Sequence, residues 1–446
     1  MVGEKAPWED TVAPLVTLAS AEGKPVLLLC SEGFDANDLT EHLTKANAKP
    51  SALQIGDAAA TIEEALRAAA AVWLLGDDFS KHDVLMKQLQ AARERGAVIV
   101  GRPADVARYC PGMALVEAEQ APASGMIGLE VPSAAIFIVH NRILFNHGGD
   151  EVKLRLAASP SREVRTVSLP RGNAVDYNEL RRAAWGRTQA AYPTPEIGEP
   201  NVAKGALVIV GGGGMPKDIA ERFFELGGGE AGHFVVLPTA MPDPLPPGNE
   251  GAFLERLGAK HITVIKARDQ EELETAENLA AFDEATAIWF GGGRQWRFVD
   301  AYEGTKVYDR LHNVLARGGV IGGSSAGATI QGEYLVRGAP AGPHIMMCEG
   351  YERGFNFLPG TAIDQHFKQR NRFADMTAFM KAYPQYLGIG LDEATAIIVQ
   401  GQTAEVLGRG EVHFYNRRAE QVEGEADYES VSAGKKYDLK ERKVVE

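Results

Sequence analysis

The chain has 446 residues, of which 45% are hydrophobic and 24% are charged, and its formal net charge is −14 at pH 7. This length favours two domains, and this composition is typical of a soluble globular protein. The acidic charge, with no cluster of Lys and Arg, argues against a nucleic-acid partner. No stretch approaches the roughly 18 continuous apolar residues that a membrane-spanning helix needs, so we expect no membrane partner.

Three well-separated cysteines, Cys30, Cys110 and Cys348, suggest neither a disulfide framework nor a CxxC metal site. We expect all three to be reduced and mostly buried. The N-terminal segment MVGEKAPWEDTVAPL contains acidic residues and has no apolar core, so it does not resemble a signal peptide. A cytoplasmic location is therefore expected.

The first half contains four apolar segments of strand length. They lie in KPVLLLCSEGFDAND (24–38), AAVWLLGDD (70–78), ERGAVIVGRPADVA (94–107) and SAAIFIVHNRILFNHGGDEVKL (133–154). The proline-rich segment AAYPTPEIGEPN (190–201) follows, and such segments are typical linkers. We therefore predict a first domain over 1–192, a linker over 193–204 and a second domain over 205–446.

The second half alternates short apolar strands with helical segments. Strands are predicted at 206–210, 233–240, 261–267 and 286–293, and a helical stretch over 302–317 leads to the strand in GGVIGG. This alternation indicates an α/β fold with a mostly parallel sheet covered by helices on both faces. Functional groups gather at the carboxyl ends of the strands in such folds, and the glycine runs lie there.

The four segments of the first half parallel four segments of the second half in the same order. Their counterparts are GALVIVGGGGMPKDI, TAIWFGGGR (286–294), ARGGVIGGSSAGAT (316–329) and ATAIIVQGQTAEVLGRGEVHFY (394–415). This order predicts a tandem duplication, although any two parallel-sheet domains share Val/Ile strands and glycine turns. Arg102 and Pro103 stand opposite the serine pair of GGSSAGA, and Pro132 stands opposite Glu393. The first copy is therefore predicted to be degenerate and catalytically silent.

The segment Gly323-Ser324-Ser325-Ala326-Gly327 fits the pattern G-x-S-x-G with Ser325 in the centre. It follows a strand and precedes a predicted helix, which is the context of a nucleophile elbow. In such an elbow the small neighbours allow a strained turn that exposes the hydroxyl, and the helix N-terminus can stabilise an oxyanion. The alternative is an ordinary glycine-rich turn.

A serine nucleophile needs a base, and the base needs an orienting acid. Of ten histidines, His344 and His366 remain candidates, because the others, His413 included, stand in ordinary surface or core contexts or in the first half. His366 follows an apolar run and precedes Arg370 and Arg372. This pattern indicates a site that fixes a base and holds an anionic group, with a solvated helix start as the alternative.

Two adjacent carboxylates, Asp392 and Glu393, separate two apolar segments in YLGIGLDEATAIIV (386–399). Either of them could orient His366, and a simple turn is the alternative. The order of serine, histidine and carboxylate differs from the Ser, Asp/Glu, His order of α/β-hydrolases.

Five motifs of the second half are GGSSAGA, AIDQHFKQRNR, GIGLDEATA, WFGGGRQ and the strand VVLPTA. Together they resemble those of the cyanophycinase group of the S51 serine peptidases, relatives of the Asp-specific dipeptidase E. The resemblance covers about 205–446 and includes the closing segment VSAGKKYDL. It implies the three-layer α/β sandwich of the class I glutamine amidotransferases (flavodoxin-like), with no metal or organic cofactor. It also implies a homodimer, for which a fused copy could substitute as an intrachain pseudo-dimer.

The resemblance also implies roles for single residues. Ser325 would be the nucleophile, His366 the general base and then acid, and Glu393 the group that orients His366. The oxyanion hole would be formed by Gly292 or Gly293, together with Ala326. The residues that would line the substrate pocket are Gln295, Asp364, Gln365, Arg370 and Arg372.

Two departures from the family pattern argue against the polymer cyanophycin as substrate. Arg294 replaces the usual Asp or Asn, and Asp375 replaces an arginine that helps to grip the aspartyl-arginine unit. We therefore expect a serine exopeptidase that hydrolyses aspartyl or β-aspartyl peptides through an acyl-enzyme on Ser325. The alternative is a catalytically silent binding or scaffold protein of the same fold. A glutamine amidotransferase is excluded, because its elbow needs a cysteine.

Overall fold

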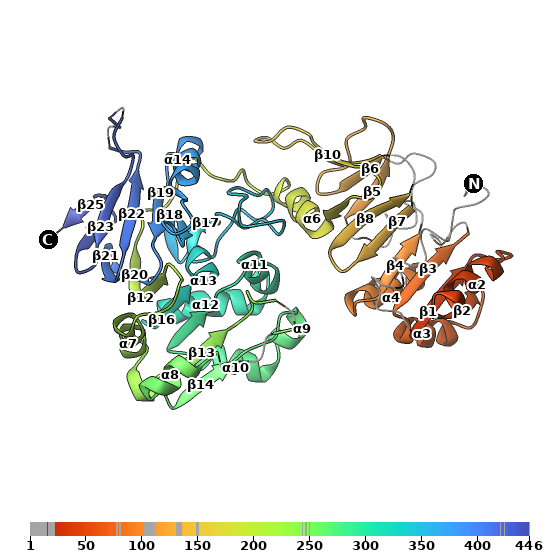
Figure 1. The fold of residues 1–446 in the computed structure, drawn as a ribbon, viewed down its shortest axis with the longest axis horizontal. Helices are drawn as coiled ribbons and strands as arrows, with labels where there is room; N and C mark the ends of the chain where they lie inside the picture. The colour runs from red at the N-terminus through yellow and green to blue at the C-terminus, as the bar shows by residue number, and fades with distance from the viewer. Residues whose placement is uncertain are drawn as a thin grey trace. The chain divides into compact units, whose positions relative to one another are not determined.

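A computed structural model describes the chain except for residues 1–15, 17–22, 77–78, 80–81, 102–109, 111, 131–135, 149–150, 243, 246–247, 249, 420, 423 and 446. Arg102, Pro103 and Pro132 therefore lie outside the described residues. The chain divides into two compact units, Met1–Tyr192 and Pro193–Glu446 (Figure 1). Cys30, Cys110 and Cys348 are buried, and none of them forms a disulfide bond. No helix in the described ranges is long and apolar enough to cross a membrane.

A nine-stranded sheet forms the centre of the second unit, in the order β14-β13-β15-β16-β12-β20-β21-β24-β25. Its parallel strands are β12 (Val202–Val210), β13 (His233–Leu237), β14 (His261–Val264), β15 (Ala287–Phe290) and β16 (Val320–Ser324). Its antiparallel strands are β20 (Thr395–Gly401), β21 (Thr403–Gly408), β24 (Lys436–Asp438) and β25 (Lys443–Val445). The expectation of a mostly parallel sheet is thus corrected to a mixed one, because tight turns such as that between β20 and β21 join only antiparallel strands.

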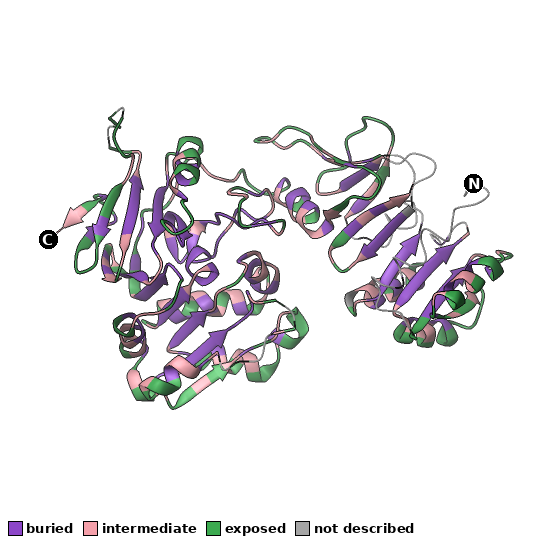
Figure 2. Cartoon of the chain, viewed as in Figure 1, coloured by how far each residue is buried: buried purple, intermediate pink, exposed green. Residues whose placement is uncertain are grey.

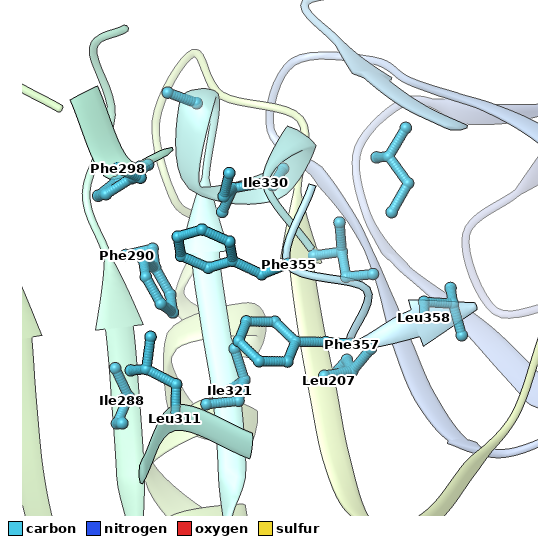
Figure 3. Close-up of a cluster of buried hydrophobic side chains, with 14 of the residues drawn as sticks. Leu207, Ile288, Phe290, Phe298, Leu311, Ile321, Ile330, Phe355, Phe357 and Leu358 are labelled. Atoms are coloured by element: carbon cyan, nitrogen blue, oxygen red, sulfur yellow. The ribbon is translucent and has the colours of Figure 1, made fainter. Parts of the chain in front are cut away.

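Helices cover both faces of this sheet, because alternate residues of each strand face opposite sides. Leu207 and Ile209 of β12 pack in one buried cluster with helices α10, α11 and α12, whereas Val208 and Val210 pack in another with α7 and α8. Figure 3 shows part of the first cluster, and Figure 2 shows the buried strands. The helical bounds are α7 (Lys217–Leu226), η2 (Gly229–Ala231), α8 (Ala252–Leu257), α9 (Gln270–Leu273), α10 (Ala276–Glu284), α11 (Trp296–Tyr302) and α12 (Lys306–Ala316).

A five-stranded sheet completes the second unit, in the order β17-β18-β19-β22-β23. Its strands are β17 (Gly332–Tyr334), β18 (Leu358–Gln365), β19 (Leu387–Leu391), β22 (Glu411–Asn416) and β23 (Glu429–Ser432), and α14 (Phe373–Ala382) follows β18. β18 and β19 are parallel, with Gln365 beside Leu391. The residues that follow these two strands therefore emerge at the same edge of the sheet.

The first unit has a seven-stranded sheet, β11-β8-β7-β4-β3-β1-β2, and a four-stranded sheet, β10-β9-β6-β5. The strands of the larger sheet are β1 (Pro25–Cys30), β2 (Lys49–Gln54), β3 (Ala71–Leu75), β4 (Val98–Gly101), β7 (Ile136–His140), β8 (Ile143–Gly148) and β11 (Ala174–Asp176). Those of the smaller sheet are β5 (Met113–Val116), β6 (Ile127–Glu130), β9 (Val152–Leu156) and β10 (Arg165–Leu169). The helices are α2 (Asn37–Lys45), α3 (Ala59–Ala68), α4 (Asp83–Glu94) and α6 (Tyr177–Gly186).

The sheet order corrects one of the four pairings predicted between the halves. β1 lies between β2 and β3, as β13 lies between β14 and β15, so β1 occupies the position of β13 and not that of β12. β3, β4 and the β7–β8 hairpin follow one another in their sheet in the order of β15, β16 and the β20–β21 hairpin. β4 pairs directly with β7, whereas β12 separates β16 from β20. A short apolar run does not reveal its neighbours in the sheet, so this pattern does not distinguish β12 from β13.

Candidate active site

Ser325 lies directly after β16 and before the short helix α13 (Ala326–Thr329). Its backbone has φ 56° and ψ −112°, a conformation that costs energy for any residue with a side chain. The Ser325 N–H donates to Val210 O at 3.0 Å, which ties the turn to the end of β12. A Cβ on Gly323 would lie 2.3 Å from Gly327 O, so this turn requires glycine at that position.

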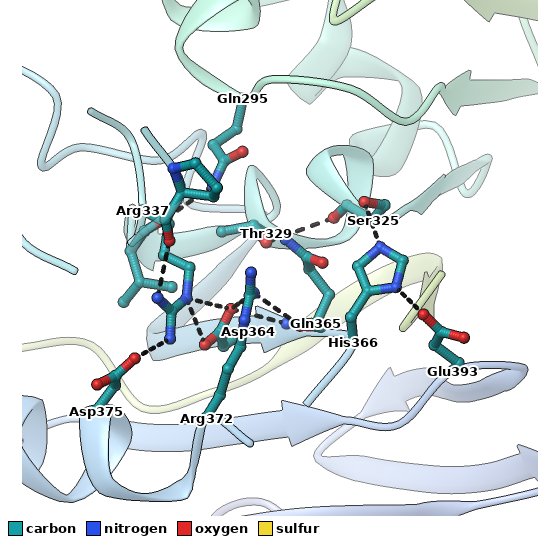
Figure 4. A network of polar contacts seen from close by, with 12 residues as sticks. Gln295, Ser325, Thr329, Arg337, Asp364, Gln365, His366, Arg372, Asp375 and Glu393 are labelled. Carbon is teal, nitrogen blue, oxygen red and sulfur yellow. Dashed lines mark hydrogen bonds and ion pairs between the residues drawn. The ribbon is translucent and has the colours of Figure 1, made fainter. Parts of the chain in front are cut away.

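His366 follows the last residue of β18 and also has a positive φ, 50°. Its N–H donates to Gly211 O at 2.8 Å, which joins the end of β18 to the glycine turn after β12. Its Nε2 lies 3.0 Å from Ser325 Oγ, within hydrogen-bond distance (Figure 4). The structure therefore brings together the side chains predicted as nucleophile and base.

Glu393 lies on the other side of the His366 ring from Ser325 (Figure 4), and its Oε1 is 2.6 Å from His366 Nδ1. When Nδ1–H donates to this carboxylate, Nε2 is left to accept a proton from the serine hydroxyl. The Glu393 N–H donates to Gln369 Oε1 at 2.9 Å, which fixes the turn that carries the carboxylate.

The surroundings of His366 favour its neutral form. The residue is only 8% exposed. Burial lowers the pKa of His366 below its usual value; the hydrogen bond to Glu393 opposes this effect, and the positive charges of Arg370 and Arg372 add to it. The neutral imidazole is the form that can accept a proton from Ser325.

Asp392, the other candidate acid, contacts His413 and not His366. It is 2% exposed, and its Oδ1 lies 3.3 Å from His413 Nε2. The carboxylate also accepts hydrogen bonds from the N–H groups of Lys368 and Glu411, at 3.1 and 3.2 Å. Burial alone would raise the pKa of Asp392, but these hydrogen bonds outweigh it and lower the pKa. Of the two adjacent carboxylates, Glu393 is the one that contacts His366.

The residues predicted to form an oxyanion hole lie close to the elbow. A Cβ on Gly292 would be 3.5 Å from Ser325 Cβ, and Ala326 is the first residue of α13. Gly293 has φ 139°, and a Cβ there would lie 2.1 Å from Ala240 O. Within the described residues, the amide N–H groups of Gly292, Gly293 and Ala326 donate no hydrogen bond. An N–H group without an internal partner is the kind of donor that an oxyanion hole needs.

The glycine turn after β12 contacts the triad, and sequence analysis did not place it in the site. A Cβ on Gly212 would lie 2.4 Å from Cε1 of His366, and a Cβ on Gly213 would lie 2.4 Å from Oε2 of Glu393. Both glycines have positive φ, 94° and 68°. The available signal was the glycine run at a strand's carboxyl end, but residues without side chains give no indication of what they contact.

Arg337, which sequence analysis also missed, is buried and forms ion pairs next to the triad (Figure 4). Its Nε donates to both oxygens of Asp364, at 3.1 and 2.9 Å, and its Nη2 donates to Asp375 Oδ2 at 2.8 Å. Arg372 Nη1 donates to Asp364 Oδ1 at 2.5 Å and to Gln365 O at 2.8 Å. Asp364 is fully buried. Two residues predicted to line the substrate pocket, Asp364 and Arg372, thus pair with each other.

The remaining predicted pocket residues differ in exposure. Gln295 is buried, and its Nε2 donates to Val336 O at 3.0 Å. Gln365 is 5% exposed, and its buried Oε1 accepts no hydrogen bond from the described part of the chain. Arg370 is exposed. Of the two arginines, Arg370 is thus exposed, whereas Arg372 is buried and paired with Asp364.

Two further predicted residues take other positions. Arg294 Nη2 donates to Ala339 O at 2.5 Å, so this departure from the family pattern holds the segment after β17. His344, the other candidate base, is exposed in the same segment. Among the residues that the structure describes, no group of three or more His, Cys, Asp or Glu is arranged to hold a metal ion.

Comparison with known proteins identifies the family to which the chain is similar. The model of peptidase family S51 matches residues 207–407, which include Ser325, His366 and Glu393. A cyanophycinase of Geminocystis herdmanii (strain PCC 6308) is 29% identical over 224 residues, which are 48% of this chain and 82% of that protein. A cyanophycinase of Synechococcus elongatus is 30% identical over 223 residues, 48% of this chain and 69% of that protein.

Among solved structures, the crystal structure of a peptidase from an acI-B1 Actinobacterium aligns with a TM-score of 0.42 and 20% identity, over 54% of this chain and 98% of that one. The family assignment rests on the sequence matches, which lie at about 30% identity and extend over more than two thirds of the cyanophycinases. The chain therefore belongs to peptidase family S51 and is a serine-type peptidase with cyanophycinases among its relatives.

Proposed function

We propose that the second unit is a serine exopeptidase that hydrolyses aspartyl or β-aspartyl peptides through an acyl-enzyme on Ser325. The observation that carries this proposal is the hydrogen-bonded series from Ser325 Oγ through His366 to Glu393, with contacts of 3.0 and 2.6 Å. The cyanophycinases among its relatives support the choice of an aspartyl substrate.

In the proposed reaction, Ser325 Oγ attacks the scissile carbonyl carbon while His366 Nε2 takes the hydroxyl proton. The C–N bond then breaks, and His366 returns this proton to the leaving amine. A water molecule attacks the acyl-enzyme and gives a proton to His366, which passes it to Ser325 Oγ as the acid product leaves. Glu393 stabilises the imidazolium, and the N–H groups of Gly292 or Gly293 and of Ala326 stabilise the oxyanion.

Selection of an acidic substrate is assigned to Arg370. This arginine is exposed, and its N–H donates to His366 O at 2.9 Å, so it lies in the same turn as the base. A guanidinium there can pair with a substrate carboxylate. Arg294 and Asp375, which depart from the family pattern, bind Ala339 O and Arg337 within the chain. These two residues therefore have structural partners, and their presence does not argue against catalysis by Ser325.

We also propose that both units derive from one flavodoxin-like module of the class I glutamine amidotransferase type. The strands β2-β1-β3-β4 and β14-β13-β15-β16 have the same relative order, which is the 2-1-3-4 order of flavodoxin-like sheets. The smaller sheets agree as well, because β5-β6-β9-β10 and β18-β19-β22-β23 have the same sequence of parallel and antiparallel pairs.

The same register supports a silent first unit. Val116 pairs with Glu130 as Gln365 pairs with Leu391, so Glu117 occupies the position of His366. Two residues beyond Glu130 stands Pro132, opposite Glu393, and Pro103 stands opposite Ser325 in the sequence. Neither proline can supply the chemistry of its counterpart, because its side chain has no nucleophilic or hydrogen-bonding atom.

The test of the proposed function is Ser325→Ala in the full chain, with Ser324→Ala as the matched control. We expect Ser325→Ala to fold normally and to lose hydrolysis of β-aspartyl dipeptides by at least about 10³-fold. Ser324→Ala should keep it. The substrates are β-aspartyl and α-aspartyl peptides and cyanophycin, with product masses as the readout. Retained hydrolysis in Ser325→Ala, or a wild-type protein that a fluorophosphonate does not label, would refute the proposal and favour a silent binding protein.

A further inference from the structure

A second histidine–carboxylate pair, Asp392 and His413, lies beside the triad and takes no part in the reaction described above. Asp392 directly precedes Glu393, and His413 lies in β22, which pairs with β19. Both side chains are only 3% exposed, so a substrate cannot reach them. Any effect of this pair on the reaction must therefore pass through other residues.

The Asp392 carboxylate joins the two turns that carry the triad. Its Oδ1 accepts a hydrogen bond from the N–H of Lys368, two residues after His366. Its Oδ2 accepts one from the N–H of Glu411, at the start of β22. One side chain thus connects the turn after β18, the turn after β19 and the strand β22.

His413 fixes the orientation of this carboxylate. Its Nε2 lies 3.3 Å from Asp392 Oδ1, and its Nδ1 lies 2.8 Å from Ser430 Oγ. Hydrogen bonds at both nitrogens leave the imidazole ring one orientation in the plane.

Aromatic rings enclose the same imidazole. The ring centroids of Phe367, Phe373 and Tyr428 lie 5.5, 4.9 and 5.4 Å from that of His413. Phe367 is the residue directly after His366, and its N–H donates to Leu391 O at 3.0 Å. The ring of His413 therefore packs against the segment of chain that carries the base.

We propose that Asp392 and His413 are positioning residues for the reaction of Ser325, an inference that rests on the proposed function. By holding the His366 turn against the Glu393 turn, the pair maintains the 2.6 Å contact between Glu393 Oε1 and His366 Nδ1. Its loss would lengthen this contact without removing any residue that touches substrate. A misplacement of about 1 Å in an active site costs roughly 10²-fold in rate.

The test compares two variants that should lose activity with one variant that should recover it. His413→Leu removes the hydrogen bond to Asp392, and Asp392→Asn keeps the side-chain shape but replaces the acceptor Oδ1 or Oδ2 by a donor. We expect kcat to fall roughly 10- to 100-fold in each, with KM changed less than about threefold. His413→Gln, whose amide nitrogen can donate to Asp392 from the place of Nε2, should recover most of kcat.

A second readout separates positioning from a purely structural role. The charged groups that act on His366 are Glu393, Arg370 and Arg372, and of these Glu393 raises its pKa. A weakened contact with Glu393 should therefore shift the acid limb of kcat/KM to lower pH in His413→Leu. The control is His312→Leu, which removes a partly buried ring packed on Tyr308 and Phe357 of the same unit. It should lower Tm and leave kcat and the acid limb unchanged.

The proposal is overturned if His413→Leu and Asp392→Asn lower Tm as His312→Leu does but retain wild-type kcat per fluorophosphonate-labelled site. Failure of His413→Gln to recover any of the lost rate would also overturn it. The Ser325→Ala variant distinguishes failure of the positioning role from failure of the proposed function. Activity in Ser325→Ala would refute the proposed function. If Ser325→Ala is inactive and His413→Leu is fully active, only the positioning role is refuted.

Discussion

His366 lies between influences of opposite sign. Burial and two arginines lower its pKa, and Glu393 raises it, with a net decrease. Because the neutral ring accepts the proton of Ser325, a lower pKa extends the active form of the enzyme to lower pH. The acid limb of kcat/KM should therefore have its midpoint below the usual histidine value of about 6.5.

Arg370→Gln tests this origin of the pH dependence. The substitution removes a positive charge that disfavours the imidazolium, so the pKa of His366 should rise and the midpoint of the acid limb should move to higher pH. The measurement is kcat/KM for a β-aspartyl dipeptide as a function of pH. The control is Lys368→Gln, which removes an exposed cation of the same turn that is not one of the main charges acting on His366, and it should shift the midpoint less than Arg370→Gln does. A midpoint that stays or falls in Arg370→Gln would contradict this account.

At the scale of residues, a position after a strand within a short motif made Ser325 and His366 candidates, and the family resemblance implied Glu393 as the orienting acid. From the residues alone, sequence reasoning left Asp392 and Glu393 open, because the conformation of a turn decides which of two adjacent side chains faces the base. It missed Arg337, whose partners lie 27 and 38 positions away in the sequence. A local sequence pattern does not indicate contacts between residues so far apart in the chain.

At the scale of elements, the glycine turn after β12 determines how closely the triad packs. Gly212 and Gly214 both have positive φ, 94° and 109°. A Cβ on Gly212 would overlap the His366 ring at 2.4 Å, whereas nothing lies within 4 Å of the corresponding position on Gly214. Alanine at either position would strain the backbone, but only alanine at position 212 would also clash with the His366 ring.

Gly212→Ala and Gly214→Ala form a matched pair of variants. Each should lose about 1–3 kcal/mol of stability from positive φ at a residue with a side chain, measured by urea unfolding. Gly212→Ala should also lose at least about 10²-fold in kcat, because its methyl group displaces His366. Gly214→Ala should retain kcat. Equal kcat values in the two variants would show that the turn does not position the base.

The strands predicted in the second half overlap β12, β13, β14 and β15, since buried strands of a parallel sheet are short apolar runs between turn residues. The separate five-stranded sheet was not predicted, because an apolar run does not reveal which strands it pairs with. The same limit explains why β1 was matched to β12 when its neighbours in the sheet give it the position of β13.

At the scale of the whole molecule, each unit has buried clusters of its own, built from its own strands and helices. The first unit has the strand order of the second without a strand in the place of β12 among its described residues. The turn that follows β12 carries the glycines that contact His366 and Glu393. The absence of that strand among the described residues and the prolines opposite Ser325 and Glu393 in the sequence both fit the proposal of a silent first unit.

A silent first unit predicts one reactive serine per chain. A fluorophosphonate should add a single adduct to each 48.0 kDa chain, on Ser325, as read by intact mass and peptide mapping, and should add none to Ser325→Ala. A second adduct, or one within 1–192, would contradict the silent copy.

If the first unit also substitutes for a second protomer, light scattering should give the mass of one chain, whereas a stable homodimer would contradict the pseudo-dimer. The two measurements are independent, because a degenerate copy can lose its nucleophile with or without taking over a dimer contact.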